Sequence, residues 1–287
     1  MSMKNKSTLR ELHRKGISLL SKKNNPSLES KTILLNTTDI TEEKFYSEPD
    51  FEVTPKKINE FFKKLEQRKK GMPLAYLTGS KEFWSMDFEV GSGVLIPRPE
   101  TEVLVEKALE LCSEKKEMMV DIGTGCGNVA VALAKEKPGA TIMGLDISFQ
   151  AVRYARKNAV AHNVPNVEFA VGDLFAPFKK NMMEKECRII VSNPPYVDEK
   201  EWMALEPQIR DHEPKQALVS GEEGTAFIKR LISQAPDYLM PGGYLLFEIG
   251  KGQEEKVRSF FNRKWKRVSC LEDLAGIKRV FQAERVL

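Results

Sequence analysis

An alternation of short apolar segments with segments of helical periodicity, over residues 118–284, constrains the fold more than any other feature. The apolar segments predict strands, and the segments between them, whose apolar residues recur every three or four positions, predict helices. Strands are expected at residues 118–122, 140–146, 167–171, 188–192, 244–249, 266–271 and 279–284, and helices from about 128 and over 151–161, 226–239 and 254–261. This order favours an α/β fold with a doubly wound, mostly parallel sheet and helices on both faces. Ligands bind such sheets at the carboxyl ends of the strands.

The length of 287 residues allows one large domain or two of unequal size. No apolar run approaches the ~18 residues of a membrane-spanning helix, and the polar, basic start of the chain lacks the apolar core of a secretory signal. Four widely spaced cysteines and only three histidines give no basis for a disulfide framework or a zinc site. We therefore expect a cytoplasmic protein that is not attached to a membrane and holds no metal.

The first 70 residues differ from the rest in charge and in pattern. They carry 16 Lys and Arg against 10 Asp and Glu, whereas residues 71–287 carry 29 against 31. Apolar residues at helical spacing predict several short helices, one of them following Pro55. Basic runs such as Arg68-Lys69-Lys70 are interpreted as solvated helix faces, and the alternative is an acidic partner, RNA or the ribosome.

Residues 81–97 predict a β-hairpin between these two regions. Apolar residues alternate on both sides of Gly91-Ser92-Gly93, which would form the turn. Pro97 and Pro99 end the segment before a helix that opens near Glu100. The hairpin is a candidate hinge or lid.

The first expected strand of the alternating region ends in an acid, Asp121, and a glycine loop, Gly123-Thr124-Gly125-Cys126-Gly127. A dinucleotide-binding loop would need glycine where Asn128 stands, and no Gly-Lys-Ser/Thr follows to make a phosphate-binding loop. The arrangement resembles motif I of the class I S-adenosylmethionine-dependent methyltransferases. Bare glycines let a backbone approach such a cofactor closely, and the resemblance implies that Asp121 supports the loop and the amino-acid end of the cofactor. Cys126 is expected to act as a small filler.

Acidic residues end the next two strands as well, which argues against a plain strand-to-helix turn. Asp146 can accept hydrogen bonds from both ribose hydroxyls, as an acid about 20 residues after the glycine loop does in dinucleotide folds. Asp173 and Leu174 would flank adenine, with the carboxylate toward the amine and Leu174 against the ring. Asp173 could equally be a helix cap or a turn residue.

The fourth strand closes on a second motif, Asn193-Pro194-Pro195-Tyr196. The prolines stiffen the turn and remove backbone donors, so that the Asn193 side-chain oxygen and the Pro194 carbonyl can accept hydrogen bonds from one nitrogen. Tyr196 can then cover the planar group that they hold. Such a grip suits an amide or aromatic NH2, a weak nucleophile whose lone pair it aims at a sulfonium methyl, so catalysis is positioning and electrostatic preorganisation. The motif indicates the type of reaction but not the substrate. It is shared by methyltransferases that act on the amine of adenine or cytosine and by those that act on glutamine.

The segments around these motifs resemble the HemK/PrmC family, whose members methylate the glutamine side-chain amide in the Gly-Gly-Gln motif of class I peptide chain release factors. The likeness lies at residues 73–79, 82–84, 94–102, 213–218, 241–243, 248–253 and 273–280. It implies a class I methyltransferase fold with a seven-stranded sheet over 100–287, a hairpin linker over 73–99, and a helical release-factor-binding domain over 1–72.

The resemblance also implies the site. Cofactor contacts are expected at Asp121, Gly123, Thr124, Gly125, Cys126, Gly127, Asp146, Asp173, Leu174 and Asn193. Substrate contacts are expected at Asn193, Pro194, Pro195 and Tyr196, and catalytic roles at Asn193, Pro194 and Tyr196. Some members carry an aromatic residue in place of Leu174, so we expect weaker stacking on adenine. Arg98 and Glu100 either position the hairpin over the site or form an Arg–carboxylate pair.

Two other functions remain as alternatives. One is an adenine-specific DNA or RNA methyltransferase, which the slightly negative charge of residues 71–287 disfavours because duplex binders present a strongly basic face. The other is a protein that binds S-adenosylmethionine without turnover, which the intact Asn-Pro-Pro-Tyr motif disfavours. We therefore expect a release factor as the partner and no direct binding of nucleic acid.

Overall fold

The computed structural model describes residues 7–113, 116–178, 187–273 and 275–286, which form two compact units. The first unit comprises the described part of Met1–Ser80 together with Pro207–His212. The second comprises the described parts of Lys81–Glu206 and Glu213–Leu287. The functional domain boundaries that the sequence suggests stay a prediction.

The first unit is built from short helices around an apolar core. Its helices are α1 (Leu9–Leu19), α2 (Pro26–Thr38), α3 (Glu42–Ser47), α4 (Pro55–Lys69), α5 (Leu74–Thr78) and α10 (Pro207–Arg210), and β1 (Ser7–Thr8) pairs with β2 (Glu52–Val53). Residues at helical spacing on three of these helices, such as Leu12, Leu34 and Phe61, are buried together. The sequence-based expectation of amphipathic helices in this region is therefore confirmed.

Arg68 departs from the interpretation of residues 68–70 as a solvated helix face. Its guanidinium is buried and forms a two-point ion pair with Glu29, with Nε–Oε2 at 2.8 Å and Nη2–Oε1 at 2.7 Å. Its Nη1 also donates to the Met72 carbonyl and to the Gln208 side chain. Lys69 and Lys70 are exposed as expected. A charge run cannot reveal such a pairing, because Glu29 lies on another helix.

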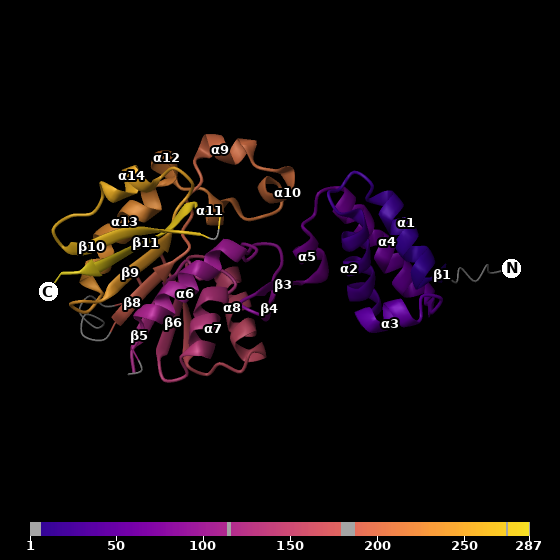
Figure 1. Ribbon diagram of the computed structural model, residues 1–287, viewed down its shortest axis with the longest axis horizontal. Helices are drawn as coiled ribbons and strands as arrows, with labels where there is room; N and C mark the ends of the chain where they lie inside the picture. Colours follow the sequence, from indigo (N-terminus) through magenta and orange to yellow (C-terminus); the bar gives the residue numbers. More distant parts are fainter. Residues whose placement is uncertain (1–6, 114–115, 179–186, 274, 287) are drawn as a thin grey trace. The chain divides into compact units, whose positions relative to one another are not determined.

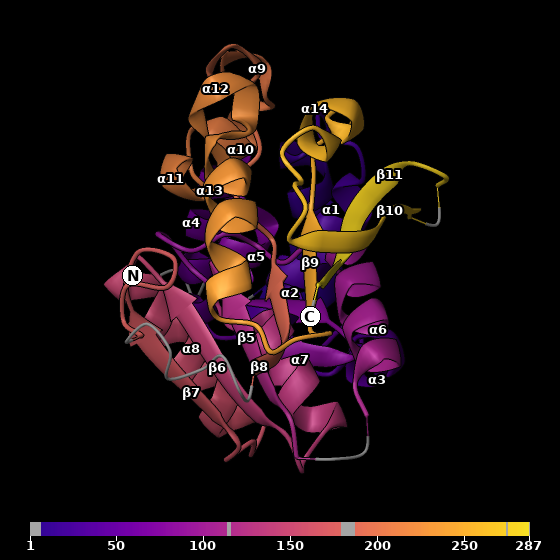
Figure 2. The same cartoon turned by 90° about the vertical axis from the view of Figure 1, so that its left-hand side faces the viewer.

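The second unit contains a seven-stranded sheet in the order β10-β11-β9-β8-β5-β6-β7, which confirms the predicted sheet (Figure 2). The strands are β5 (Met118–Ile122), β6 (Thr141–Asp146), β7 (Val167–Val171), β8 (Cys187–Ser192), β9 (Tyr244–Glu248), β10 (Trp265–Glu272) and β11 (Lys278–Arg285). Strands β5 to β9 are parallel, whereas β11 runs antiparallel to both of its neighbours. The central strands β5 and β8 are buried on both faces, which explains their continuous apolar sequences.

Helices pack against this sheet. Helices α6 (Glu102–Leu111), α7 (Asn128–Glu136) and α8 (Phe149–Ala161) lie side by side, as Figure 1 shows. Helix α13 (Ala226–Gln234) buries Ile228, Leu231 and Ile232 with the β5 residues Val120 and Ile122. The remaining elements of this unit are β3 (Ser80–Phe83, beginning one residue before the unit), β4 (Met86–Glu89), η1 (Pro99–Thr101), α9 (Glu199–Ala204), α11 (Lys215–Leu218), α12 (Gly221–Gly224), η2 (Ala235–Asp237) and α14 (Glu254–Arg258).

The hairpin is present, but the predicted turn is wrong. Its strands are β3 and β4, and the residues between them, Trp84 and Ser85, both have positive φ, at 53° and 54°. Tight hairpin turns require this backbone, which glycine and asparagine usually supply. Because neither residue stands at these positions, no local signal marked the turn. Side-chain carboxylates hold the turn, since Trp84 N donates to Glu102 Oε1 at 2.8 Å. The residues after Gly93, predicted as the second strand, form no strand.

The hairpin is fixed to helix α8 by Asn158, which is buried. The Asn158 side chain accepts from Glu89 N at 2.7 Å and donates to the carbonyls of Glu89 and Cys126. One side chain therefore connects the end of β4 to the glycine loop after β5.

The strand order reverses between β5 and β8. From β5 the chain proceeds outward through β6 and β7, and then continues through β8 and β9 on the other side. Loops that leave the carboxyl ends of β5 and β8 diverge at this point, which is where open α/β sheets bind ligands. Among the described residues, no helix is both long and apolar enough to span a bilayer.

Candidate active site

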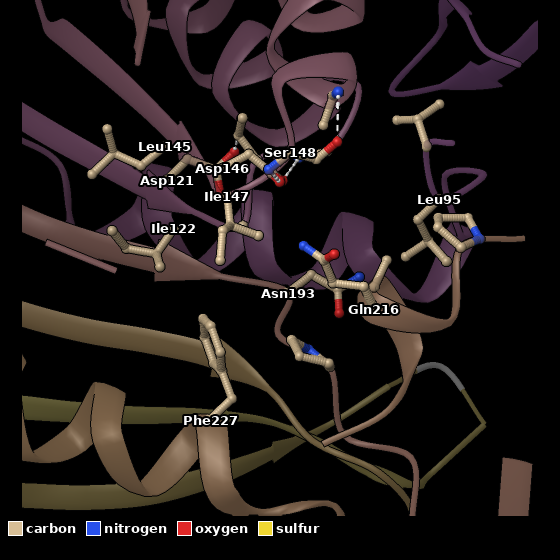
Figure 3. A pocket seen from close by; sticks show the side chains of 18 of the residues that line it. Leu95, Asp121, Ile122, Leu145, Asp146, Ile147, Ser148, Asn193, Gln216 and Phe227 are labelled. Carbon is tan, nitrogen blue, oxygen red and sulfur yellow. Dashed lines mark hydrogen bonds between the residues drawn. The ribbon is translucent and has the colours of Figure 1, made fainter. Parts of the chain in front are cut away.

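A cavity of about 420 Å³ lies at the carboxyl ends of β5 to β8. Its lining includes nine of the residues that the sequence predicts for the site: Asp121, Gly123, Thr124, Gly125, Asp146, Asp173, Leu174, Asn193 and Pro195. Figure 3 shows Asp121 and Asp146 on one side of the cavity and Leu95 on the other, with Asn193 between them. Four predicted residues, Cys126, Gly127, Pro194 and Tyr196, do not line it.

The glycine loop is held by bonds to the neighbouring strand. The amides of Gly123 and Thr124 both donate to the Leu145 carbonyl, at 2.8 and 2.9 Å, and Thr124 Oγ1 donates to Asp121 at 2.7 Å. Gly127 has φ of 83°, and a Cβ there would stand 2.9 Å from the Ala155 Cβ, so this position requires glycine. These contacts hold the backbone of the loop at the wall of the cavity.

Cys126 is buried beneath the loop, as its predicted role of filler requires. Burial raises the pKa of its thiol to about 12, so the reactive thiolate is scarce at neutral pH. Its carbonyl is the one that accepts from Asn158. The residue therefore supports the loop from behind.

Asp146 is half-buried and organises two turns at once. Its Oδ2 accepts from Gly125 N at 2.9 Å and its Oδ1 from Ser148 N at 2.8 Å. Burial raises the pKa of this carboxyl, and the two backbone amides oppose that rise. Each oxygen retains a second lone pair for a ligand.

Asp121 lies deeper, with its side chain almost fully buried. Removal from water raises the pKa of Asp121 to about 7; the Thr124 hydroxyl opposes this rise, and the Asp146 charge adds to it. A buried carboxyl with a raised pKa on the wall of a cavity is a candidate functional group.

Asp173 and Leu174 occupy the rim and the wall, respectively. Asp173 is exposed and pairs with Arg230 of α13 at 2.6 Å. Leu174 is buried and adopts φ of 50°, which turns it into the cavity lining. Arg230 could not be identified from the sequence, because the pair joins elements far apart in the chain.

Asn193 faces the cavity from the end of β8. Its Nδ2 donates to Thr101 Oγ1 at 2.9 Å. Pro195 also lines the cavity, whereas Pro194 is buried. Tyr196 turns its hydroxyl to Glu248, at 3.0 Å, and its ring packs against the core. Burial and the nearby Glu248 raise the pKa of Tyr196.

Arg98 forms the Arg–carboxylate pair that was one of its two predicted roles. Its Nη2 lies 2.6 Å from Glu213 Oε1, and the other Glu213 oxygen accepts from Ile96 N at 3.0 Å. Glu213 is almost fully buried, and Arg98 and Pro214 both line the cavity. The pair therefore joins two walls of the site. Glu100 is exposed and does not line it.

Two buried residues that the sequence analysis did not assign to the site stand directly behind it. Thr101 and Glu248 are both buried, and Thr101 Oγ1 donates to Glu248 Oε2 at 2.8 Å. Glu248 is the last residue of an apolar strand, and Asp121 is the last but one of another. An acid in such a position was the sequence signal that could have identified Glu248 as a site residue.

A seven-stranded sheet with a glycine loop after β5 and acids at the ends of the next strands defines a class I S-adenosylmethionine-dependent methyltransferase. Two solved structures share the fold. A methyltransferase from Pyrococcus furiosus matches with a TM-score of 0.52 and 19% identity, covering 72% of this chain and 92% of that one. A Thermus thermophilus 16S rRNA N2 G1207 methyltransferase in complex with AdoMet and guanosine matches with a TM-score of 0.50 and 19% identity, covering 72% and 49%.

Comparisons with related sequences identify the family, whereas the solved structures show only the fold. Residues 11–79 match the family described as PrmC N-terminal domain, and residues 99–213 match Methyltransferase small domain. The release factor glutamine methyltransferase of Thermodesulfovibrio yellowstonii is 39% identical over 256 residues, which is 88% of this chain and 90% of that one. That of Buchnera aphidicola is 37% identical over 268 residues, covering 93% and 95%. The chain belongs to the release factor glutamine methyltransferase family, which confirms the resemblance found in the sequence.

Proposed function

We propose that this protein transfers a methyl group from S-adenosylmethionine to the side-chain amide nitrogen of the glutamine in the Gly-Gly-Gln motif of class I peptide chain release factors. The observation that carries the proposal is the placement of Asn193 in the same cavity as Asp121 and Asp146. This arrangement sets a carboxamide able to hold an NH2 group beside residues suited to a cationic, ribose-bearing cofactor.

The residues present fit S-adenosylmethionine. The cavity volume of about 420 Å³ is within the usual range for small-molecule sites. We assign the cofactor's amino-acid end to Asp121 and to the loop that Thr124 stabilises, and the ribose hydroxyls to Asp146. Leu174 and Asp173 then border the adenine. Arg230 binds Asp173 Oδ2, so we assign Asp173 Oδ1 to the amine of the adenine. Cys126 and Gly127 shape the loop from behind.

When bound, S-adenosylmethionine supplies a methyl group on a positively charged sulfur. We assign the glutamine to Asn193, whose side-chain oxygen accepts a hydrogen of its NH2 group and helps to point its lone pair at the methyl carbon. That the Pro194 carbonyl accepts the second hydrogen stays a prediction, because Pro194 is buried and does not line the cavity. The nitrogen lone pair forms the bond to the methyl carbon while the carbon–sulfur bond breaks and leaves its electron pair on the sulfur, which becomes a neutral thioether. The nitrogen then loses one proton to water, so no tuned base is required. Pro195 fixes the turn. That Tyr196 covers the amide stays a prediction, and its bond to Glu248 supports at least a fixed position for the motif.

The release factor is the proposed partner, with the helical region 1–72 as its docking domain and the cytoplasm as the compartment. A methyltransferase of nucleic-acid amines is the alternative. It is disfavoured by the 29 Lys and Arg against 31 Asp and Glu in residues 71–287, since phosphate binding requires a basic surface.

The decisive experiment measures transfer of labelled methyl from S-adenosylmethionine to a purified class I release factor. The same factor with its Gly-Gly-Gln glutamine replaced by alanine and a duplex DNA are assayed beside it. Label on the unaltered factor alone is the expected result. Label on DNA alone would mean that the protein methylates an NH2 group but that a release factor is not its substrate.

Cofactor affinity is expected to depend on pH through Asp121. A cationic ligand favours the ionised carboxylate and so lowers the pKa of Asp121 from its value of about 7. Affinity should therefore rise with pH below about 7, by up to about tenfold per pH unit, and level off above about 8, with a proton released on binding near neutrality. Calorimetry in buffers of different ionisation enthalpy measures both effects. Asp121→Asn should flatten this dependence, and a pH-independent affinity in the unaltered protein would contradict it.

A further inference from the structure

Four side chains, of which Asn193 alone lines the cavity, form one hydrogen-bonded series. Asn193 Nδ2 donates to Thr101 Oγ1, Thr101 Oγ1 donates to Glu248 Oε2, and Tyr196 OH donates to Glu248 Oε1, over 2.9, 2.8 and 3.0 Å. The residues come from η1, the end of β9 and the turn after β8. Thr101 and Glu248 do not line the cavity, so neither is placed to touch a ligand there.

With Glu248 ionised, the series has one consistent direction. A carboxylate only accepts, so both oxygens of Glu248 accept from hydroxyls, those of Thr101 and Tyr196. A threonine hydroxyl has one hydrogen, and that of Thr101 goes to Glu248, so its oxygen can only accept from Asn193. The NH2 end of the Asn193 carboxamide is the end that can donate. Its oxygen is therefore the end left to face the cavity.

This direction matters because a carboxamide can rotate by a half turn at little cost when nothing holds it. In the reversed orientation Asn193 would present its own NH2 group to a substrate NH2 group, donor against donor. Positioning of the acceptor then depends on residues that do not themselves meet the substrate.

Burial strengthens the constraint. Thr101 and Glu248 are almost completely inaccessible, so water does not compete for their bonds, and an unmade bond there would leave a polar group unsatisfied. Burial raises the pKa of Glu248, and the Thr101 and Tyr196 hydroxyls act against that rise. Placing an acid at this depth is costly, and here the acid is the common acceptor of the Thr101 and Tyr196 hydroxyls.

We propose that Thr101 and Glu248 are positioning residues that hold the Asn193 carboxamide with its oxygen toward the substrate. The proposal rests on the assignment of Asn193 as the holder of the glutamine amide. It adds two buried residues, one from the end of η1 and one from the end of β9, to the determinants of the reaction.

The test compares Thr101→Val, which keeps the shape but removes both bonds, with Thr101→Ser, which keeps the hydroxyl. Thr141→Val is the matched control, because Thr141 is exposed at the start of β6, at the opposite end of that strand from the cavity. Three quantities are measured for each protein: single-turnover methyl transfer to the release factor, the dissociation constant for S-adenosylmethionine, and the NMR signals of the Asn193 NH2 group, assigned with Asn193→Ala.

We expect Thr101→Val to slow transfer by about tenfold or more, with cofactor affinity within about twofold of the unaltered protein and with shifted Asn193 signals. Thr101→Ser should restore both transfer and signals, and Thr141→Val should change neither. Unaltered transfer and signals in Thr101→Val would overturn the proposal, as would a loss of cofactor affinity that Thr101→Ser does not repair. If the unaltered protein leaves the release factor unmethylated, the proposed function fails, and the Asn193 signals still decide the orientation.

Discussion

Asn193→Ala is expected to reduce single-turnover methyl transfer by about a hundredfold or more while S-adenosylmethionine still binds. The side-chain oxygen accepts from the substrate NH2 group in the proposed geometry, and removing one preorganised hydrogen-bonding group of this kind costs about two to three orders of magnitude. The truncation leaves Asp121, Asp146 and the glycine loop in place, and these residues carry the cofactor. Rapid-quench transfer at saturating cofactor gives the first quantity, and calorimetry gives the second.

Asn262→Ala is the matched control, because Asn262 is exposed in the turn before β10. It should leave both quantities unchanged. A variant of Asn193 that lost cofactor binding yet showed normal single-turnover chemistry would contradict the assigned role.

Asp146→Ala is expected to weaken cofactor binding by about 1–3 kcal/mol, which corresponds to roughly 5- to 150-fold in the dissociation constant. Two hydrogen bonds to ribose hydroxyls are lost in the proposed complex. In addition, Gly125 N and Ser148 N lose the acceptors that fix their turns. Transfer at saturating cofactor should fall much less than the affinity, since Asp146 does not meet the substrate amide.

Isothermal titration of S-adenosylmethionine measures the change, with Asp50→Ala as control. Asp50 is an exposed carboxylate paired with Arg10 in the first unit. Equal affinities of the Asp146 variant and the unaltered protein would remove Asp146 from the site.

Much of the sheet and of the cofactor site could be predicted because both depend on local sequence. Strands β5 and β7 lie where their apolar segments predicted, and Asp121 and Asp146 line the cavity because parallel strands end at a common edge. The hairpin turn was missed for an equally local reason. Trp84 and Ser85 adopt a left-handed backbone without the residues that usually mark it.

The sequence could not indicate which residues come into contact only when the chain is folded. Glu213 closes on Arg98 and Ile96, and Glu248 closes on Thr101 and Tyr196, across long stretches of sequence. Glu213 looks like a surface charge until its partners are known, whereas the place of Glu248 at the end of an apolar strand indicates burial but not its partners. Their pairing follows from tertiary packing, which local periodicity does not encode.

The division of the chain into compact units has a consequence for its modularity. The polypeptide passes between the units at three places, near residues 80, 206 and 212, because Pro207–His212 folds with the first unit. A gene fragment that stops at Ser80 would omit Gln208, one of the partners that satisfy the buried Arg68. A fragment that starts at Lys81 would contain Pro207–His212 but not the rest of the first unit, with which that segment folds. Recombination that exchanges the N-terminal helices between relatives must therefore transfer two separate stretches of coding sequence to retain the whole unit.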